Sequence, residues 1–183
     1  ECIVGDPAAE SQYFSAKAEI FLQQRRFAEM FDAYDLALGE SGMGMMAHGA
    51  MEYAFLVGLY REKSRYERAL DMLAQWHRRL SAGSLQVFGR KLENNFGGDA
   101  GAAMILWEQG KHEKAIKPAR DALKKAMANE GPIPGHPQIG VVPPLPDKLR
   151  NRLIVIADLW DEAELGPRPD IDSYEFTAPP ATG

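Results

Sequence analysis

Cysteine is nearly absent from this sequence, because Cys2 is the only one in 183 residues. A single cysteine excludes an intramolecular disulfide and a cluster of thiolate metal ligands. A surplus of basic residues is also absent, since the formal net charge is −5 at pH 7 and the sequence pI is about 5.4. Domains that bind nucleic acid usually carry such a surplus, so we expect no nucleic-acid partner.

Long apolar runs are missing as well. A helix that crosses a bilayer needs ~18 consecutive apolar residues, and the longest candidate, residues 47–60, contains His48 and Glu52. We therefore expect no transmembrane segment. The chain begins with Glu1 instead of methionine, which predicts that a leader, an anchor or another segment has been removed. An exported bacterial protein and a cytoplasmic protein both fit this beginning.

The sequence lacks the motifs of common catalytic sites. No serine stands in a nucleophile-elbow context, and the glycine-rich stretch 42–49 has no lysine, which a phosphate-binding loop needs. Residues 95–99 resemble an anion-binding loop, but Asp99 opposes an anion there, so we expect a turn at 94–98 and a helix that Asp99 caps. His48 and Glu52 are spaced to bind a metal from one helix face, but two ligands make no site. We expect no catalytic residue, no bound metal and no cofactor.

What the sequence does contain is a helical pattern that recurs three times. Each copy has a large apolar residue near the end of one helix, a short polar turn, and a second helix with apolar residues at helical spacing. The copies run through Phe21, Phe27, Met30, Tyr34, Ala37 and Leu38, then through Tyr60, Tyr66, Ala69, Leu73 and Trp76, and then through Leu106, His112, Ala115, Ala119, Ala122 and Leu123. A chain that repeats a helical hairpin buries each hairpin on its neighbour and leaves an extended surface for a partner.

Local signals place the helix boundaries. Asp6 and Pro7 begin the first helix, Gly39 ends the second, and Ser64 to Glu67 has the form of a capping box. Pro118 predicts a kink or a late start in its helix. His112 takes a packing position in the third copy, and we expect its side chain to lie in the core or half-buried. The predicted helices cover residues 7–22, 27–38, 45–60, 64–80, 99–109, 111–129 and 149–165, with a weaker candidate over 84–92 and a glycine-rich connector at 41–44.

We interpret residues 1–183 as a single domain. The repeat region covers 7–129 and a Pro/Gly-rich loop follows at 130–148, because six prolines and three glycines in 131–146 exclude a regular helix. The C-terminal helix covers 149–165, with Leu149, Leu153, Ile156 and Trp160 along one stripe. An irregular tail follows at 166–183, and its residues Ile171, Tyr174 and Phe176 are expected to pin it to the body.

These residues resemble the tetratricopeptide repeat family. In the first helix of each copy, the late position holds Phe21, Tyr60 and Leu106, and the close-contact position holds Ala18, Val57 and Ala103. In the second helix, the aromatic position holds Phe27, Tyr66 and His112. The first alanine position of that helix holds Met30, Ala69 and Ala115, and the second holds Ala37, Trp76 and Ala122. Spacings of 39 and 46 residues between second-helix aromatics exceed the family's roughly 34, which insertions at 41–46 and 84–98 account for. The resemblance implies an all-α fold of stacked antiparallel helical hairpins, an α-solenoid of about three repeats.

The resemblance also implies a module that binds a protein or peptide and performs no catalysis. First helices line the inner surface in this family, so the expected contact residues are Lys17, Gln24, Glu52, Tyr53, Leu56 and Tyr60. Two alternatives remain at this point: an inhibitor or immunity-type protein with one cognate partner, and a small helical hydrolase or metal-dependent enzyme. The oligomeric state stays open.

Basic residues of the predicted 111–129 helix supply a second candidate surface. Lys114, Lys117 and Lys124 can share one helix face. From Ala126 onward the chain has nine acidic residues and four basic ones. The lysines therefore form either a solvated face partly paired with the acidic C-terminal segment, or a docking site for an acidic peptide or protein.

Overall fold

The computed structural model describes residues 7–39, 47–81, 96–128, 142–174 and 176, and their regular structure is helical throughout. The helices are α1 (Pro7–Gln23), α2 (Phe27–Leu38), α3 (Ala47–Leu59), α4 (Tyr66–Ser81), α6 (Phe96–Glu108), α7 (His112–Ala126), α8 (Asp147–Ile156) and α9 (Glu162–Leu165), with the 3-10 helices η1 (Lys63–Arg65) and η3 (Ile171–Tyr174). No strand occurs in these residues, which confirms the predicted all-α class. None of the described helices has the length and apolar character needed to cross a bilayer.

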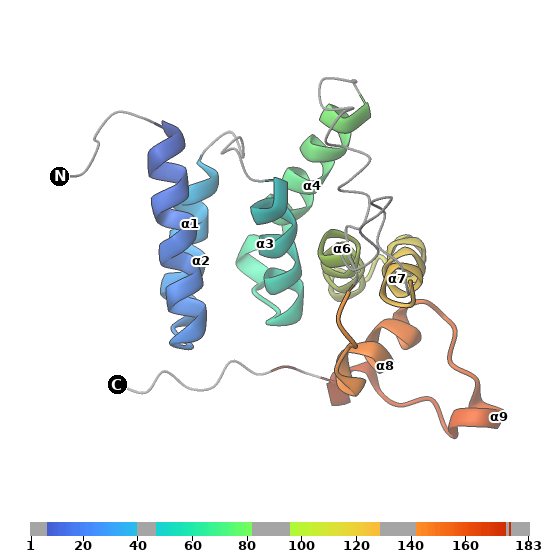
Figure 1. The fold of residues 1–183 in the computed structure, drawn as a ribbon. Coiled ribbons are helices and arrows are strands. Elements are labelled where there is room, and N and C mark those ends of the chain that lie inside the picture. Colours follow the sequence, from blue (N-terminus) through green and yellow to red (C-terminus); the bar gives the residue numbers. More distant parts are fainter. Residues whose placement is uncertain (1–6, 40–46, 82–95, 129–141, 175, 177–183) are drawn as a thin grey trace.

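The helices pack in consecutive pairs (Figure 1). α1 lies against α2, α3 against α4 and α6 against α7, and short turns join α1 to α2 and α6 to α7. Neighbouring pairs meet mainly where α3 packs along α6, while α8 packs on α7 and α6, and η3 folds back onto α8. The three predicted helix pairs are therefore present.

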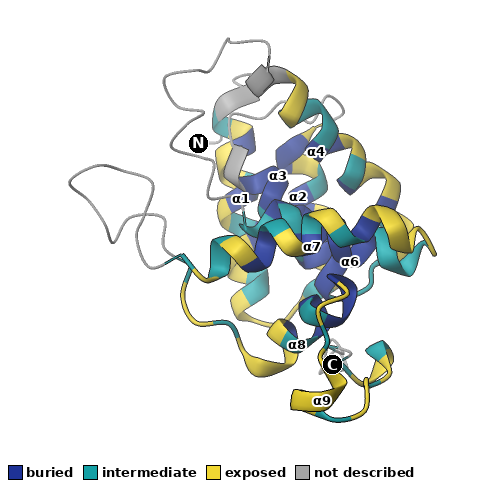
Figure 2. Ribbon diagram, turned by 90° about the vertical axis from the view of Figure 1, so that its right-hand side faces the viewer, coloured by how far each residue is buried: buried dark blue, intermediate teal, exposed yellow. Residues whose placement is uncertain are grey.

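Two groups of buried apolar side chains hold the helices together. The first lies among α1 to α4, where the ring of Tyr53 meets Phe31 and Tyr34 edge to face at centroid distances of 6.2 and 6.1 Å. The second joins α6, α7 and α8 and includes Ala103 and Ala119. Figure 2 shows buried residues on the sides of helices that face their neighbours, and exposed residues on the outer sides. Burial of these apolar faces is the main force that holds the pairs together.

The same type of turn ends α1, α3, α6 and α8. A residue with positive φ follows each helix, and the next N–H donates back to the carbonyl five residues earlier, which is the Schellman motif. The positive-φ residues are Arg25 (58°), Arg61 (55°), Gly110 (72°) and Asp158 (55°). The bonds run from Arg26 to Phe21, Glu62 to Val57, Lys111 to Leu106 and Leu159 to Ile154, at 2.8 to 3.1 Å. Three of the four turns use a residue other than glycine, so the sequence carries no glycine signal for them.

The positions of these turns correct the sequence alignment of the second helix pair with the other two. The residues seven before the positive-φ position are Ala18, Ala54 and Ala103 in the first three helices of the series, and all three are fully buried. Val57, which the sequence pattern placed at this position, lies three residues later. The shift arises because η1 lengthens the turn between α3 and α4.

α3 and α6 approach so closely that backbone meets backbone. A Cβ added at Gly101 would lie 2.5 Å from the carbonyl oxygen of Ala54 and 2.6 Å from the amide nitrogen of Phe55. A Cβ added at Gly58 would lie 2.9 Å from the carbonyl oxygen of Gly101. Only glycine, which has no Cβ, permits this contact.

The predicted turn at 94–98 and the predicted Asp99 cap are wrong in the described part of that stretch. α6 begins at Phe96, so Gly97 and Gly98 are helical and Asp99 lies inside the first turn. The Asp99 carboxylate instead forms an ion pair with Lys125 of α7 at 2.5 Å. Glycine raises turn propensity in a sequence, but here contact with α3 decides its conformation.

The predicted capping box at Ser64 is also wrong. Ser64 lies in η1, and its hydroxyl donates to the Glu62 carboxylate at 2.6 Å instead of accepting from the backbone of Glu67. α4 begins at Tyr66. α7 begins at His112, so Pro118 lies inside the helix and causes no late start. His112 is exposed and its ring stacks on Trp107 at a centroid distance of 4.2 Å, so the expectation of a core or half-buried histidine is wrong.

The predicted helix over 149–165 is broken. α8 ends at Ile156, and the positive φ of Asp158 turns the chain before α9. Side chains from elsewhere satisfy the freed carbonyls, since Arg168 donates to Val155 at 2.7 Å and Arg120 donates to Ala157 at 2.9 Å. The predicted apolar stripe is buried only as far as Ile156. Ile171 and Phe176 do pack against the second core group, as expected of the tail.

Several predictions fall outside the described residues. They are the Asp6 cap, the connector at 41–44, the side chain of His48, the helix over 84–92 and residues 130–141 of the loop.

Candidate functional site

An apolar groove of about 440 Å³ opens between α7, α8 and α9, and we call it the α8 groove. Its lining is Leu123, Ala126, Met127, Pro144, Leu145, Arg150, Ile154, Leu159 and Leu165. Six large apolar side chains are exposed in the described part of the chain, and three of them, Met127, Leu159 and Leu165, line this groove. Exposed apolar groups that gather at one place with polar residues around them are typical of a binding surface.

A set of local bonds fixes the two leucines that close the groove. Leu159 follows the Schellman turn of Asp158, whose carboxylate pairs with Arg168 at 3.1 Å. Leu165 ends α9, which begins where the Asp161 side chain accepts from the N–H of Ala163 at 2.9 Å. The groove wall on this side is therefore held by specific polar contacts.

The rim of the groove differs in charge between its two sides. α9 presents the exposed acidic residues Asp161, Glu162 and Glu164. On α7, the exposed Lys124 directly follows Leu123 of the lining. Arg150, also in the lining, pairs with Asp147 at 2.8 Å.

A smaller hollow of about 240 Å³ lies between α1 and α2 at the other end of the row. It is lined by Phe14, Lys17, Phe21, Glu29, Asp32, Ala33 and Leu36. Lys17 and Phe21 precede the positive-φ Arg25 by eight and four residues, and Arg150 and Ile154 precede Asp158 by the same intervals. Residues at the same distances before the turns that end α1 and α8 therefore line the two hollows.

The contact residues expected on the first helices are dispersed. Lys17 lines the smaller hollow, and Gln24 is exposed in the first turn. Glu52 is partly exposed on α3, and Tyr60 is partly covered by the ring of Phe27 at 4.5 Å. Tyr53 and Leu56 are buried in the first core group. These two side chains are not at the surface, because α3 turns them toward its neighbours.

The three lysines of the predicted basic face are all exposed on α7. Lys117 pairs with Asp121 one turn later, and this hydrogen bond raises the pKa of the lysine. Lys114 and Lys124 extend into solvent from the same helix. Their role in binding an acidic partner stays a prediction.

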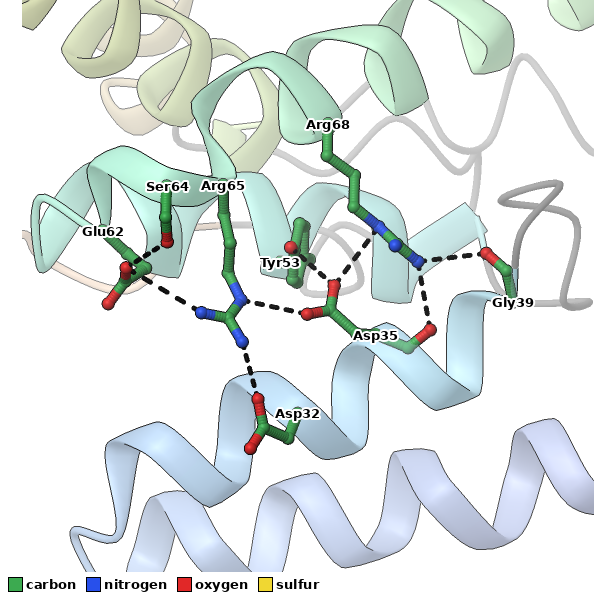
Figure 3. Close-up of polar contacts among 8 residues, drawn as sticks. All are labelled: Asp32, Asp35, Gly39, Tyr53, Glu62, Ser64, Arg65 and Arg68. Carbon is green, nitrogen blue, oxygen red and sulfur yellow. Dashed lines mark hydrogen bonds and ion pairs between the residues drawn. The ribbon is translucent and has the colours of Figure 1, made fainter.

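A polar network centred on Asp35 joins α2 to α3 and α4 (Figure 3). One Asp35 oxygen accepts from Tyr53 at 2.8 Å and faces Arg68 at 3.2 Å, and the other accepts from Arg65 at 3.0 Å. Burial, and then the bond to Asp35, raise the pKa of Tyr53. Because both carboxylate oxygens are engaged by the protein, we assign this network to holding the helices in register and not to binding a ligand.

Within the described residues, no three His, Cys, Asp or Glu side chains are grouped to hold a metal ion. Comparison with known proteins gives no significant match to a family model, to a curated protein or to a solved structure.

Sequence reasoning missed the α8 groove. Leu159 and Leu165 fell inside a predicted continuous helix, and Met127 fell near the end of another. All three are large apolar side chains beside the Pro/Gly-rich loop or the acidic segment. This shared feature was the sequence signal that could have indicated the groove.

Proposed function

We propose that this protein is a helical-repeat binding module that takes a helix of a partner protein into the α8 groove. Support for the repeat comes from the turns. α1, α3, α6 and α8 end in the same hydrogen-bonded geometry, and α2, α4 and α7 begin at Phe27, Tyr66 and His112, the three positions that the pattern aligned. A repeated hairpin is stabilised by contacts between neighbours.

In this arrangement α8 is the first helix of a fourth hairpin that has no full second helix. The chain after the α8 turn makes only the four-residue α9 before it leaves for η3. The second helix of a hairpin packs against the first helix of its own pair, and here that place is the α8 groove. The exposed leucines on its wall are the residues that such a helix would cover. This unfilled place is the observation that carries the proposal.

The chain's own neighbouring segments supply no helix for the groove, although Pro144 and Leu145 form part of its lining. Residues 131–146 hold six prolines, which exclude a regular helix, and the tail after Phe176 holds two more in seven residues. We therefore take a helix from another molecule as the occupant. Helix-in-groove recognition uses apolar anchors at positions i, i+3 or i+4, and i+7.

The charges on the rim define the chemistry of this occupant. Basic residues along one flank would meet Glu162 and Glu164 of α9, and an acidic residue on the other flank would meet Lys124. The partner is thus an amphipathic helix with an apolar stripe and charged flanks. We assign the protein to recognition and not to catalysis.

A paired substitution tests this proposal. Immobilised wild-type chain, Leu159→Glu and Leu36→Glu are compared in capturing partners from a lysate of the source cells. The two leucines are matched in exposure, at 53% and 59%, but Leu36 lies on α2. We expect the Leu159→Glu chain to lose a protein that the other two retain. Equal capture by all three chains contradicts the proposal.

A direct probe does not depend on finding the partner. A labelled synthetic peptide of residues 66–81 copies α4, a second helix with apolar residues at Tyr66, Ala69 and Leu73. We expect saturable binding by fluorescence anisotropy, lost with Leu159→Glu and retained with Leu36→Glu. A control peptide with Ala69 and Leu73 changed to Glu should not bind. No difference between the two peptides would show that the groove does not accept a helix of this type.

A further inference from the structure

Large exposed apolar side chains lie at the two ends of the row of helices. Three of the six in the described residues line the α8 groove, and the other three are Tyr13, Ile20 and Leu36 of α1 and α2, with exposed fractions of 56%, 51% and 59%. The described parts of α3, α4, α6 and α7 carry none. Figure 1 shows α1 and α9 at opposite ends of the molecule. Each end therefore keeps apolar surface in contact with solvent, as binding surfaces do.

Two of these side chains form a stripe along α1. Tyr13 and Ile20 are two helical turns apart, and Lys17 lies between them on the same face. The Lys17 ammonium lies 5.9 Å from the centre of the Tyr13 ring and 5.6 Å from the centre of the Phe21 ring, so its aliphatic stem runs beside apolar surface. We call Tyr13, Lys17 and Ile20 the α1 stripe. Their spacing of i, i+4 and i+7 is the one by which a helix anchors in an apolar groove.

The charges at the two ends of the α1 stripe are opposite to those on the rim of the α8 groove. The exposed Arg25 follows the stripe in the turn after α1, and the exposed Glu10 precedes it in the first turn of the helix. On the groove, α9 presents Glu162 and Glu164, and α7 presents Lys124. A helix laid in the groove with its Arg25 end toward α9 would bring opposite charges together at both ends, whereas the reverse direction would bring like charges together.

A second copy of the chain can supply such a helix. Within one molecule the α1 stripe lies at the far end from the groove, so the two surfaces can meet only between molecules (Figure 1). Because the stripe and the groove are different surfaces, each molecule would offer its stripe to one neighbour and its groove to another. This is a heterologous contact, which grows head to tail unless it closes into a ring.

We propose that self-association regulates the α8 groove: the α1 stripe of a second copy enters the groove and covers its exposed leucines until a partner helix displaces it. This inference rests on the proposed function, because it requires that the groove accepts a helix. It adds a competitor for the site, namely a helix of the same chain. A groove closed in this way exposes less apolar surface to solvent while no partner is bound.

Sedimentation velocity of the full chain, from about 1 µM to about 1 mM, tests the contact. We expect the sedimentation coefficient of the wild type to rise with concentration. Ile20→Glu and Leu159→Glu each place a charge in the contact and should weaken the association about thirtyfold or more. Gln12→Glu adds the same charge at an exposed position of α1 outside the stripe, so it should associate like the wild type. A wild-type chain that stays monomeric over this range overturns the proposal.

A mixture of the two variants identifies the contact as head to tail. Ile20→Glu keeps an intact groove and Leu159→Glu keeps an intact stripe, so an equimolar mixture should form a one-to-one dimer that grows no further. The recovery also shows that both variants are folded. If either variant alone associates like the wild type, like surfaces are in contact; if the mixture stays monomeric, the stripe and the groove do not meet. Either result refutes the proposed contact.

The peptide of residues 66–81 separates this inference from the proposed function. In excess it should occupy the groove and return the wild-type chain to monomers. If the peptide binds and the assemblies persist, the copies meet elsewhere and only the inference fails. The same holds if the peptide binds and the wild type never associates. If the peptide does not bind at about 1 µM protein, where the groove is free of a second copy, the proposed function itself fails.

Discussion

Substitution of Gly101 by alanine tests the close contact between α3 and α6. The added Cβ would lie 2.5 Å from the Ala54 carbonyl, whereas ordinary contacts of this kind are 3.4–4 Å. The two helices must therefore separate by roughly 1 Å, because neither backbone can rotate away. Overpacking of this kind costs about 3 kcal/mol at the upper end of the usual range. The better helix propensity of alanine offsets about 1 kcal/mol.

The net loss of about 2 kcal/mol in the free energy of unfolding should lower the melting temperature by roughly 4–8 °C for a chain of this size. Gly97→Ala is the matched control on the same helix. Its Cβ would meet nothing closer than the Met51 carbonyl at 3.5 Å, so the variant should be as stable as wild type or about 1 kcal/mol more stable. Urea unfolding followed by circular dichroism measures both. If Gly101→Ala is as stable as Gly97→Ala, the close backbone contact described here is incorrect.

Three further predictions concern the polar groups. Asp35→Asn removes the charge shared by Arg65 and Arg68 and should lower the free energy of unfolding by about 1–3 kcal/mol in urea titrations, with no loss in Asp35→Glu if charge alone matters. Burial raises the pKa of Tyr66 to about 12, so its contribution to stability is complete below pH 10 and is lost as the pH rises from 10 to 12; wild type should therefore lose stability between pH 10 and 12 more steeply than Tyr66→Phe. Asp161→Ala should speed hydrogen exchange of the capped amides of α9, by a local loss of about 1 kcal/mol, without changing the global melting temperature.

The helices that could be predicted are those with strong local signals. α2 covers residues 27–38 as predicted, because its apolar residues follow helical spacing and Gly39 adopts φ +59° at its end. The starts of α4 and α7 differ from the predicted boundaries by two residues or fewer. Such signals depend on neighbours in the chain, so they are visible without the fold.

The errors occurred where distant groups decide local conformation. The break after Ile156 depends on a positive φ at Asp158 and on carbonyl contacts from Arg120 and Arg168. The helical state of Gly97 is decided by packing against α3. Neither cause is present in the local sequence.

The same contrast between local sequence signals and distant contacts applies to the candidate functional residues. The apolar residues of the α8 groove can be seen in the sequence. On a continuous helix, however, their side chains would have pointed in different directions and formed no common surface. Arg152 reads as an ordinary surface residue of an amphipathic helix. Its burial follows only from the meeting of α8 with α6 and α7.

By itself the sequence determined that the described part of the chain is helical and predicted which consecutive helices are in contact, because the spacing of apolar residues acts over a few turns. The tertiary structure alone decided that one place beside α8 stays open and that one arginine is enclosed. Both depend on which surfaces meet across the fold, and contact between residues far apart in the chain leaves no periodic signal along it.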